Sequence, residues 1–165
     1  MFTVGILTIS DKGSRRERPD KSGETIRKIL STMDVHIVNY DVIPDEKGVI
    51  VETLEGWADD DDLDVVITTG GTGLTPRDVT PEATLAVLDR IVPGFAEAMR
   101  AESLKKTPHA MLSRAVAGTR GKCLIINLPG SPRAVRECLE VILPALPHAV
   151  ETLKDQSDEC GTAES

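Results

Sequence analysis

Residues 64–73 have the sequence DVVITTGGTG, in which a short apolar run leads into threonines and three glycines. The apolar residues 65–67 are consecutive and are bounded by polar residues, a pattern typical of a strand covered on both faces. Such strands occur where helices pack on both sides of a parallel sheet. The stretch therefore predicts an α/β fold in which Gly70–Gly73 follow the end of a buried strand.

Strand and helix patterns alternate along the rest of the chain. The β-rich runs are residues 3–9, 35–43, 64–69 and 122–128. Apolar stripes with helical spacing begin near Ser22, Ile50, Thr80, Phe95 and Pro132. We expect the Thr80 helix to reach about Arg90, with the Thr80 hydroxyl as its cap, and the last helix to continue past Pro144 and Pro147.

Alternation of this kind decides the topology. Successive strands joined by helices need crossover connections, which produce a parallel sheet with helices on both faces. Residues 115–128 are expected to add a hairpin whose connection is Gly118–Gly121. The predicted fold is a three-layer α/β/α structure with a mostly parallel sheet and an antiparallel hairpin edge. Ligands then bind at the carboxyl ends of the strands.

Length and composition limit the class of protein. The 165 residues predict a single domain over 1–154, and the small polar residues at 155–165 are expected to form a disordered tail. The formal charge is 19 − 27 = −8, which disfavours a nucleic-acid partner. Cys123, Cys138 and Cys160 show no CxxC spacing and indicate a reducing, cytoplasmic location. No stretch approaches the ~20 apolar residues of a membrane span, so no membrane partner is expected.

Two loops are predicted at the carboxyl edge of the sheet with backbone groups suited to anions. In Gly70–Gly73, glycines let N–H groups turn toward a ligand, although a tight structural turn explains the loop equally well. The loop is neither a Walker A nor a GxGxxG motif. In the LPGSP segment at 128–132, Gly130 and Ser131 precede a helix N-terminus, where Ser131 also fits a plain helix cap.

Two aspartates follow predicted strands at the same edge. Asp45 and Asp78 are each explained as a helix cap or a solvated loop acid, and together they are also suited to Mg²⁺, which binds one or two carboxylates plus substrate phosphates. Arg77 is placed to neutralise phosphate charge. The loop Lys12–Lys21 holds five basic residues and either draws in an anion or forms a solvated flap.

Other polar residues carry weaker signals. The acidic run Asp59–Asp62 fits a solvated loop, and His36, His109 and His148 show neither metal-ligand nor catalytic-triad spacing.

Several motifs together resemble one family. Residues 68–83, TTGGTGLTPRDVTPEA, closely resemble the signature of the molybdopterin adenylyltransferases (MogA/MoaB type, related to the gephyrin and plant homologue domains). Matching segments follow the family's order over residues 3 to about 154: IPDE at 43–46, MLSR at 111–114, AGTRG at 117–121 and INLPGSP at 126–132.

The resemblance implies an activity. That family joins the terminal phosphate of molybdopterin to the adenylyl group of ATP with Mg²⁺ and releases pyrophosphate. The product is then a substrate for molybdenum insertion, which implies handover to an insertion enzyme. The family tends to form trimers or larger rings, so we expect a homotrimer.

The resemblance also implies roles for individual residues. Asp45 and Asp78 correspond to the essential acidic pair and would hold Mg²⁺. Thr72, Ser103 and Ser113 correspond to substrate or nucleotide contacts, alongside the Gly70–Gly73 loop. The family often has Asn or Gln where this chain has Ser131, which leaves a pterin contact at that position open.

Two other interpretations remain open at this stage. Some relatives resemble pterin-binding or oligomerisation modules without transferase activity, and the presence of both Asp45 and Asp78 favours the enzyme over that reading. The third interpretation is a nucleotide-sensing domain unrelated to molybdenum, which would bind ATP alone.

Overall fold

The structure, a computed structural model, describes residues 1–154. The tail predicted over 155–165, with Cys160, lies outside the described residues. The chain forms one six-stranded sheet with the order β2-β1-β3-β6-β5-β4. Its strands are β1 (Phe2–Ile9), β2 (Val35–Ile43), β3 (Val65–Thr69), β4 (Arg90–Ile91), β5 (Ala117–Arg120) and β6 (Cys123–Leu128). Pairs among β2, β1, β3 and β6 are parallel, and β5 pairs antiparallel with β6 and β4, which confirms the predicted mixed sheet.

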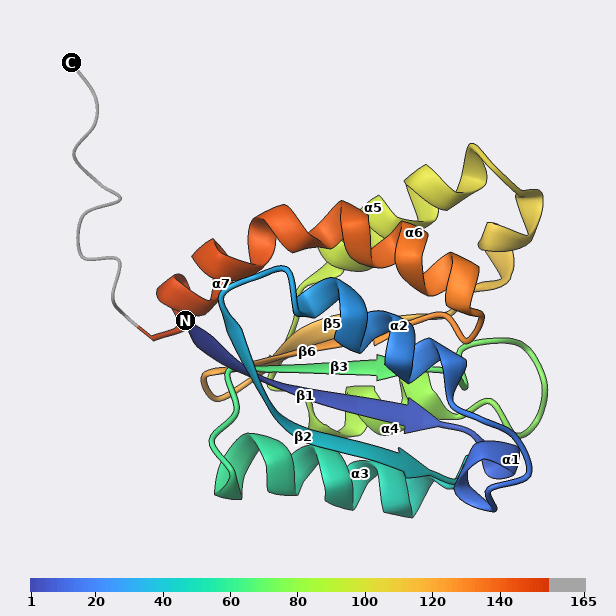
Figure 1. Cartoon of the computed structure of the whole chain (residues 1–165), viewed down its shortest axis with the longest axis horizontal. Coiled ribbons are helices and arrows are strands. Elements are labelled where there is room, and N and C mark those ends of the chain that lie inside the picture. Colours follow the sequence, from blue (N-terminus) through green and yellow to red (C-terminus); the bar gives the residue numbers. More distant parts are fainter. Residues whose placement is uncertain (155–165) are drawn as a thin grey trace.

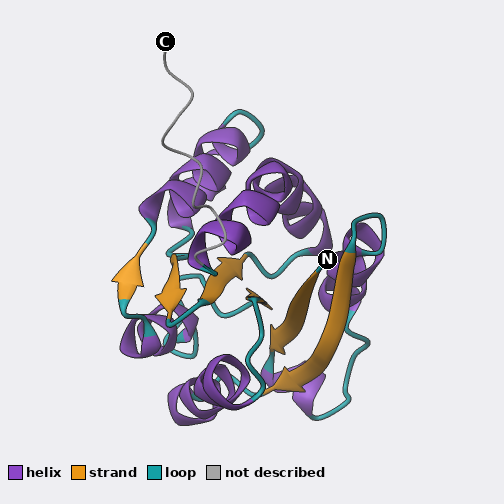
Figure 2. Cartoon of the chain, turned by 90° about the vertical axis from the view of Figure 1, so that its left-hand side faces the viewer, coloured by secondary structure: helices purple, strands orange, loops and turns teal. Residues whose placement is uncertain are grey.

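Helices cover both faces of the sheet (Figures 1 and 2). The α-helices are α1 (Asp11–Ser14), α2 (Lys21–Leu30), α3 (Lys47–Glu55), α4 (Thr80–Val87), α5 (Pro93–Leu104), α6 (Pro132–Ile142) and α7 (Leu146–Leu153). Short turns of other helix types lie at η1 (Gly56–Asp60), η2 (Pro108–Leu112) and η3 (Leu143–Ala145). In Figure 1, α2, α5, α6 and α7 lie above the sheet, and α3 and α4 lie below it.

Alternating side chains of the central strands build two cores. In β3, Val65 and Ile67 join the core under α2, α5, α6 and α7, while Val66 joins the core against α3 and α4. The same alternation places Ile126 of β6 in the first core and Ile125 in the second. Because both faces are buried, β3 has no polar side and ends in polar residues only where it leaves the sheet.

A buried amide joins the centre of the sheet to α4. The side chain of Asn127 donates hydrogen bonds to the hydroxyls of Thr68 and Thr84, each at 3.0 Å, and accepts one from the N–H of Val116 at 3.2 Å. All of these polar groups are paired, so the burial of Asn127 is compensated. The contacts fix the end of β3 relative to α4 and to the segment before β5.

Two helices begin at the carboxyl edge with capping side chains. The Asp20 carboxylate accepts a hydrogen bond from the N–H of Gly23 at the start of α2. Ser131 caps α6 by accepting from the N–H of Ala134 at 3.2 Å, as predicted, and Pro132 occupies the first turn. Both helices thus direct their N-termini toward the edge where the strands end.

The structure differs from the predicted elements at four places. The hairpin connection is Gly121-Lys122 and not Gly118–Gly121, because Gly118 pairs with Ile125 within the sheet. The α4 helix ends at Val87, and Arg90–Ile91 form the short edge strand β4, which was not predicted.

The other two differences concern helix ends. The Thr80 hydroxyl does not cap α4, because it donates instead to the carbonyl of Gly70 at 3.0 Å. The last predicted helix is interrupted at Leu143–Ala145, since prolines at 144 and 147 each lack the N–H that an uninterrupted helix needs.

Within residues 1–154, no helix is long and apolar enough to cross a membrane.

Candidate functional site

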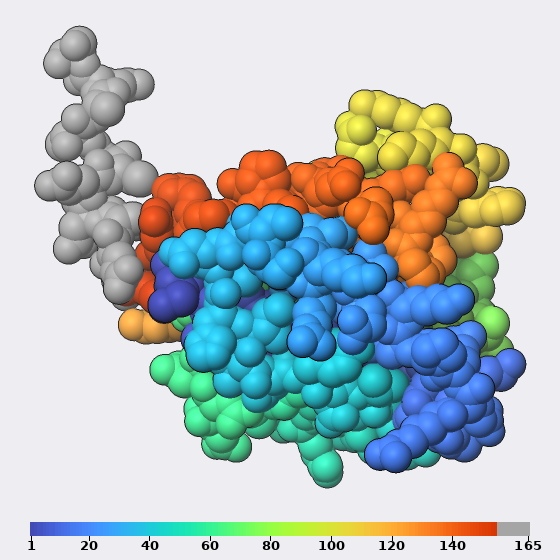
Figure 3. Space-filling model, viewed as in Figure 1, coloured from blue at the N-terminus to red at the C-terminus, as the bar shows by residue number. Residues whose placement is uncertain are grey.

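The loops that follow the parallel strands gather at one end of the sheet and surround a cavity. In Figure 1 the strands β1, β2 and β3 point toward the right, where α1 and the loop after β3 lie. The blue segment around α1 is exposed at that end of the surface (Figure 3). The cavity has a volume of about 670 Å³, and we call it the strand-end cavity. Its lining includes Ser10, Gly13, Arg18, Asp20, Lys21, Ser22, Asp45, Thr69, Gly70, Gly71, Asp78, Gly130 and Ser131.

Two consecutive glycines form its floor at the end of β3. Gly70 and Gly71 have positive φ angles of 96° and 67°, a conformation that glycine adopts without the steric cost of a side chain. A Cβ atom at Gly71 would lie 2.2 Å from the hydroxyl oxygen of Thr80 and 3.1 Å from a carboxylate oxygen of Asp45. Among the hydrogen bonds of residues 1–154, none is donated by the N–H groups of Gly71, Thr72 or Gly73. Of these three residues only Gly71 lines the strand-end cavity, so its N–H is the one placed to meet an anionic ligand.

The LPGSP loop also lines the cavity, through Gly130, Ser131 and Pro132. Its carbonyls are held by hydroxyls from two other elements: Ser22 donates to Gly130 at 2.6 Å and Thr69 donates to Pro129 at 2.6 Å. The α-carbon of Gly70 lies 3.5 Å from the position that a Cβ of Gly130 would occupy, so the two glycine-containing loops nearly touch. Their approach brings the N-terminus of α6 to the strand-end cavity, where its partial positive charge favours an anion.

Asp45 is linked to the loop after β1. Its carboxylate accepts a hydrogen bond from the N–H of Asp11 at 2.8 Å, and the Asp11 carboxylate accepts one from the N–H of Asp45 at 3.0 Å. Arg77 donates two hydrogen bonds to the Asp11 carboxylate, at 2.8 and 3.0 Å. Asp45 is not a helix cap, because the cap position of α3 belongs to Glu46.

Asp78 shapes its own loop. Its carboxylate oxygen Oδ2 accepts hydrogen bonds from the N–H and the hydroxyl of Thr75, at 3.0 and 2.8 Å. Val79, and not Asp78, occupies the cap position of α4. The helix-cap interpretation is therefore wrong for both aspartates, although Asp78 does have a structural role in its turn.

The charges of the site are unevenly compensated. Partial burial raises the pKa of Asp45 above its ordinary value, the N–H of Asp11 opposes that shift, and the neighbouring charges of Asp11 and Asp78 add to it. The hydrogen bonds from Arg77 lower the pKa of Asp11. Arg77 thus compensates the charge of Asp11 more than that of Asp45.

The Lys12–Lys21 loop supplies positive charge to the rim. Arg18 and Lys21 line the strand-end cavity, and the Arg18 guanidinium donates to the hydroxyl of Ser10 at 3.2 Å. The first part of the loop is ordered as α1, whose N-terminus Ser10 caps. In an acidic chain, these two cations favour the entry of an anionic ligand at this point.

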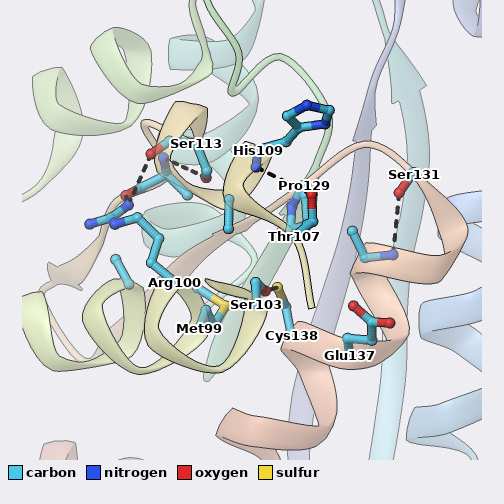
Figure 4. Close-up of a pocket in the computed structure, with 14 residues that line it drawn as sticks. Met99, Arg100, Ser103, Thr107, His109, Ser113, Pro129, Ser131, Glu137 and Cys138 are labelled. Carbon is cyan, nitrogen blue, oxygen red and sulfur yellow. Dashed lines mark hydrogen bonds between the residues drawn. The ribbon is translucent and has the colours of Figure 1, made fainter. Parts of the chain in front are cut away.

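A second cavity lies between α5, η2 and α6 (Figure 4). It has a volume of about 250 Å³ and a largely apolar lining, and we call it the helix cavity. Figure 4 shows Ser103 facing Cys138 across its floor, with a contact of 3.5 Å between the hydroxyl oxygen and the sulfur. Burial raises the pKa of the Cys138 thiol, so this sulfur is an uncharged part of the lining at neutral pH.

The candidate residues divide between the two cavities. Those lining the strand-end cavity are Asp45, Gly70, Gly71, Asp78 and Gly130, and those lining the helix cavity are Ser103 and Ser113. Ser131 lines both cavities, so the two meet at the LPGSP loop. Thr72 and Gly73 line neither cavity, and their carbonyls accept hydrogen bonds from Arg114.

Sequence reasoning missed several residues of the site. The loop at Asp11 is predicted to hold function because it follows the first strand, but the sequence assigns no role to the Asp11 side chain. Arg18 and Lys21 were noted only as members of a basic loop. Arg114 belongs to the MLSR motif at 111–114, but its contacts with the Asp78 loop could not be predicted, because Gly73 and Asp78 lie 41 and 36 positions away in the chain.

The acidic pair fits a magnesium ion that shares its ligands with a substrate. Among residues 1–154 no group of three or more His, Cys, Asp or Glu side chains could enclose a metal. Asp45 and Asp78 line one cavity and are close enough for the charge of one to raise the pKa of the other. Two carboxylates supplemented by phosphate oxygens are a typical donor set for Mg²⁺.

Fold and site together define a three-layer α/β protein with a polar, glycine-lined cavity at the carboxyl edge of its sheet. The family described as "Probable molybdopterin binding domain" matches residues 5–148. The chain belongs to this family, which confirms the resemblance inferred from its motifs.

Individual relatives agree with this assignment. The chain is 45% identical over 152 residues to a molybdopterin adenylyltransferase of Helicobacter pylori J99, covering 91% of this chain and 86% of the relative. It is 42% identical over 144 residues to a molybdopterin adenylyltransferase of Escherichia coli K12, covering 86% and 74%. The crystal structure of the molybdopterin biosynthesis enzyme MoaB from Thermus thermophilus superposes with a TM-score of 0.89 at 54% identity, covering 94% and 98%.

Replacement of Gly71 tests the glycine floor. In Gly71→Val, the side chain would meet Thr80 and Asp45 at a positive φ, so we expect affinity for ATP or molybdopterin to fall by more than about tenfold, or about 1.4 kcal/mol. Gly121→Val is the matched control, because Gly121 also has a positive φ, of 54°, but no atom lies within 4 Å of its Cβ position. Titration calorimetry on both folded variants measures the difference, and unchanged affinity in Gly71→Val would exclude this floor as the ligand site.

The raised pKa of Asp45 predicts a pH-dependent stability difference. The folded protein holds the Asp45 proton more tightly than the unfolded chain does, so its stability falls as pH rises through the window above the ordinary aspartate pKa. Asp45→Asn removes this partly buried charge and should raise the free energy of unfolding at pH 7, with the gain disappearing below about pH 4. Urea unfolding at both pH values measures this, with exposed Asp61→Asn as control. A variant less stable than wild type at pH 7 would contradict the assigned electrostatics.

Proposed function

We propose that this protein is a nucleotidyltransferase that adenylylates molybdopterin, using ATP and releasing pyrophosphate, in molybdenum cofactor biosynthesis. The observation that carries the proposal is the convergence of Asp45, Asp78 and the Gly70–Gly71 floor on one cavity. The curated relatives of similar length that bear the name molybdopterin adenylyltransferase support the same chemistry.

The chemistry needs positioning and charge compensation more than covalent help from the protein. The terminal phosphate oxygen of molybdopterin attacks the α-phosphorus of ATP, and the bond to the β-phosphate breaks as pyrophosphate leaves. The unpaired N–H of Gly71 and the N-terminus of α6 would bind phosphate oxygens. Arg18 and Lys21 would attract the triphosphate.

Magnesium is part of the proposal. Asp45 and Asp78 would hold it, and the ion would supply compensation for the charge that develops on the transferred phosphate. The helix cavity would accept the flat ring system of one substrate, since its lining is apolar with a few polar groups such as Ser103 and Ser113. Ser131, between the cavities, would lie near the junction of ring and phosphate.

Removal of either aspartate charge tests the transferase activity. Asp45→Asn and Asp78→Asn keep the side-chain shape and an acceptor oxygen, and the site keeps its N–H groups for phosphate. We expect each variant to fold and to bind molybdopterin nearly as well as wild type. Steady-state pyrophosphate release should fall on the order of 10²–10³-fold, because charge in the transition state loses its compensation.

The double variant and a control sharpen this experiment. Since loss of one ligand already disables the metal, the double variant should be little slower than either single variant. Asp61→Asn, from the exposed acidic run, should keep full activity. Activity of Asp78→Asn within a few-fold of wild type would favour a non-catalytic pterin-binding or oligomerisation module. Binding of ATP without molybdopterin-dependent turnover in the wild type would favour a nucleotide sensor.

We further propose a cytoplasmic homotrimer that passes its product to a molybdenum insertion enzyme. Exposed apolar side chains support an oligomer: Ile91 on the edge strand β4 is 59% exposed and Met111 on η2 is 67% exposed. Sedimentation equilibrium at micromolar concentration should give about three times the chain mass of 17.8 kDa. A species of monomer mass under these conditions would contradict the trimer.

A further inference from the structure

One arginine outside both cavities binds the loop that carries Asp78. The guanidinium of Arg114 donates from Nε to the carbonyl of Gly73 at 2.8 Å and from a terminal nitrogen to the carbonyl of Asp78 at 2.7 Å. The backbone N–H of Arg114 also donates to the carbonyl of Thr72 at 2.9 Å. One residue therefore binds the loop at its beginning and at its end.

The remaining terminal nitrogen of Arg114 pairs with Glu82 on α4. This ion pair lowers the pKa of Glu82. Glu82 thereby orients the guanidinium so that its other donors face the two loop carbonyls. Lysine could not replace this arrangement, because a single ammonium group lacks the planar set of donors that reaches several acceptors at once.

Within the loop itself, the Asp78 carboxylate forms hydrogen bonds that stabilise the turn, in addition to the contacts from Arg114. It accepts from the N–H and hydroxyl of Thr75, and the N–H of Asp78 donates to the carbonyl of Thr75 at 3.0 Å. These bonds use Oδ2, whereas Oδ1 accepts no hydrogen bond within residues 1–154, and Asp78 lines the strand-end cavity. The position of this carboxylate depends on the path of the loop, which Arg114 binds at both ends.

Arg114 also connects the two cavities. Its neighbours Ser113 and Ala115 line the helix cavity, and Arg100 donates to their carbonyls at 3.3 and 3.0 Å, as Figure 4 illustrates. The segment 113–115 is thus fixed on one side by α5 and, through the Arg114 side chain, fixes the Asp78 loop on the other.

We propose that Arg114 is a positioning residue, which closes the loop of residues 73–78. By closing the loop it fixes the position of Asp78 at the strand-end cavity relative to the helix cavity. This inference rests on the proposed function for its catalytic consequence. Its structural part concerns the free protein and can be measured without any ligand.

The test replaces Arg114 by lysine and, as a second variant, by glutamine. We expect kcat for pyrophosphate release to fall about 10²-fold in both, the loss typical of a small misplacement of a catalytic group, with the KM for molybdopterin nearly unchanged. Hydrogen exchange followed by mass spectrometry should show faster exchange in peptides that contain the amides of Thr75 and Asp78.

Arg120 provides a matched control at the opposite end of the sheet. Its guanidinium donates to the carbonyl of Val87 at 2.9 Å and to the carboxylate of Asp59 at 2.7 to 3.2 Å, so it makes the same kinds of contact far from the site. Arg120→Lys should lose stability comparably and leave kcat and exchange at residues 73–78 unchanged. Glu82→Gln, which keeps an acceptor for Arg114, should retain most of the activity.

The outcomes are distinct. Equal kcat in Arg114→Lys and Arg120→Lys, or unchanged exchange of the Thr75 and Asp78 amides, would overturn the proposal. Failure of both Arg114 variants to fold, with Arg120→Lys folded, would also overturn it by assigning Arg114 to general stability. A wild-type protein without pyrophosphate release would instead contradict the proposed function, and the exchange measurement would still decide whether Arg114 closes the loop.

Discussion

The central strand β3 lies between two helix layers with both faces buried, and it leaves the sheet through two glycines in left-handed conformation. Burial on both faces means that its ladder hydrogen bonds must be complete and that polar groups of the chain become available only at its end. The left-handed turn at Gly70 and Gly71 follows at once, and the N–H groups after it have no partner within the described residues. The site is thus a consequence of how a fully buried strand ends.

The site contains several cations although the chain as a whole is acidic. The chain has a formal charge of −8, and yet Arg18, Lys21 and Arg77 gather around the cavity that holds the acidic pair. Arg77 is hydrogen-bonded to Asp11, whereas partial burial and the neighbouring acids raise the pKa of Asp45. A site that handles phosphates needs cations at its entrance and a place for a divalent ion inside, and these two requirements are met by different residues.

Local patterns predicted the elements well wherever one strong signal acted alone. The buried run at 65–69, the Ser131 cap and a helix starting near Ser22 follow from residues within a few positions of one another. Predictions were wrong where a partner in another element competed. Thr80 could cap its own helix, but its hydroxyl binds Gly70, and Gly118 fits a turn but pairs in the sheet with Ile125. In both cases a partner in another segment outcompeted the local preference, which is a weak bias.

By itself, the sequence determined the α/β class, the glycine loop, the acidic pair and membership of the molybdopterin-binding family. Apolar periodicity is a local pattern, and the order of the motifs can be read directly along the chain. Only the tertiary structure decided that Ser131 stands between two cavities and that neither aspartate caps a helix. It alone also showed that Asp11 binds Asp45 across 34 positions and that Arg114 reaches the Asp78 loop from 36 positions away. Contacts of that kind arise from the packing of whole elements, and no spacing within a single segment encodes them.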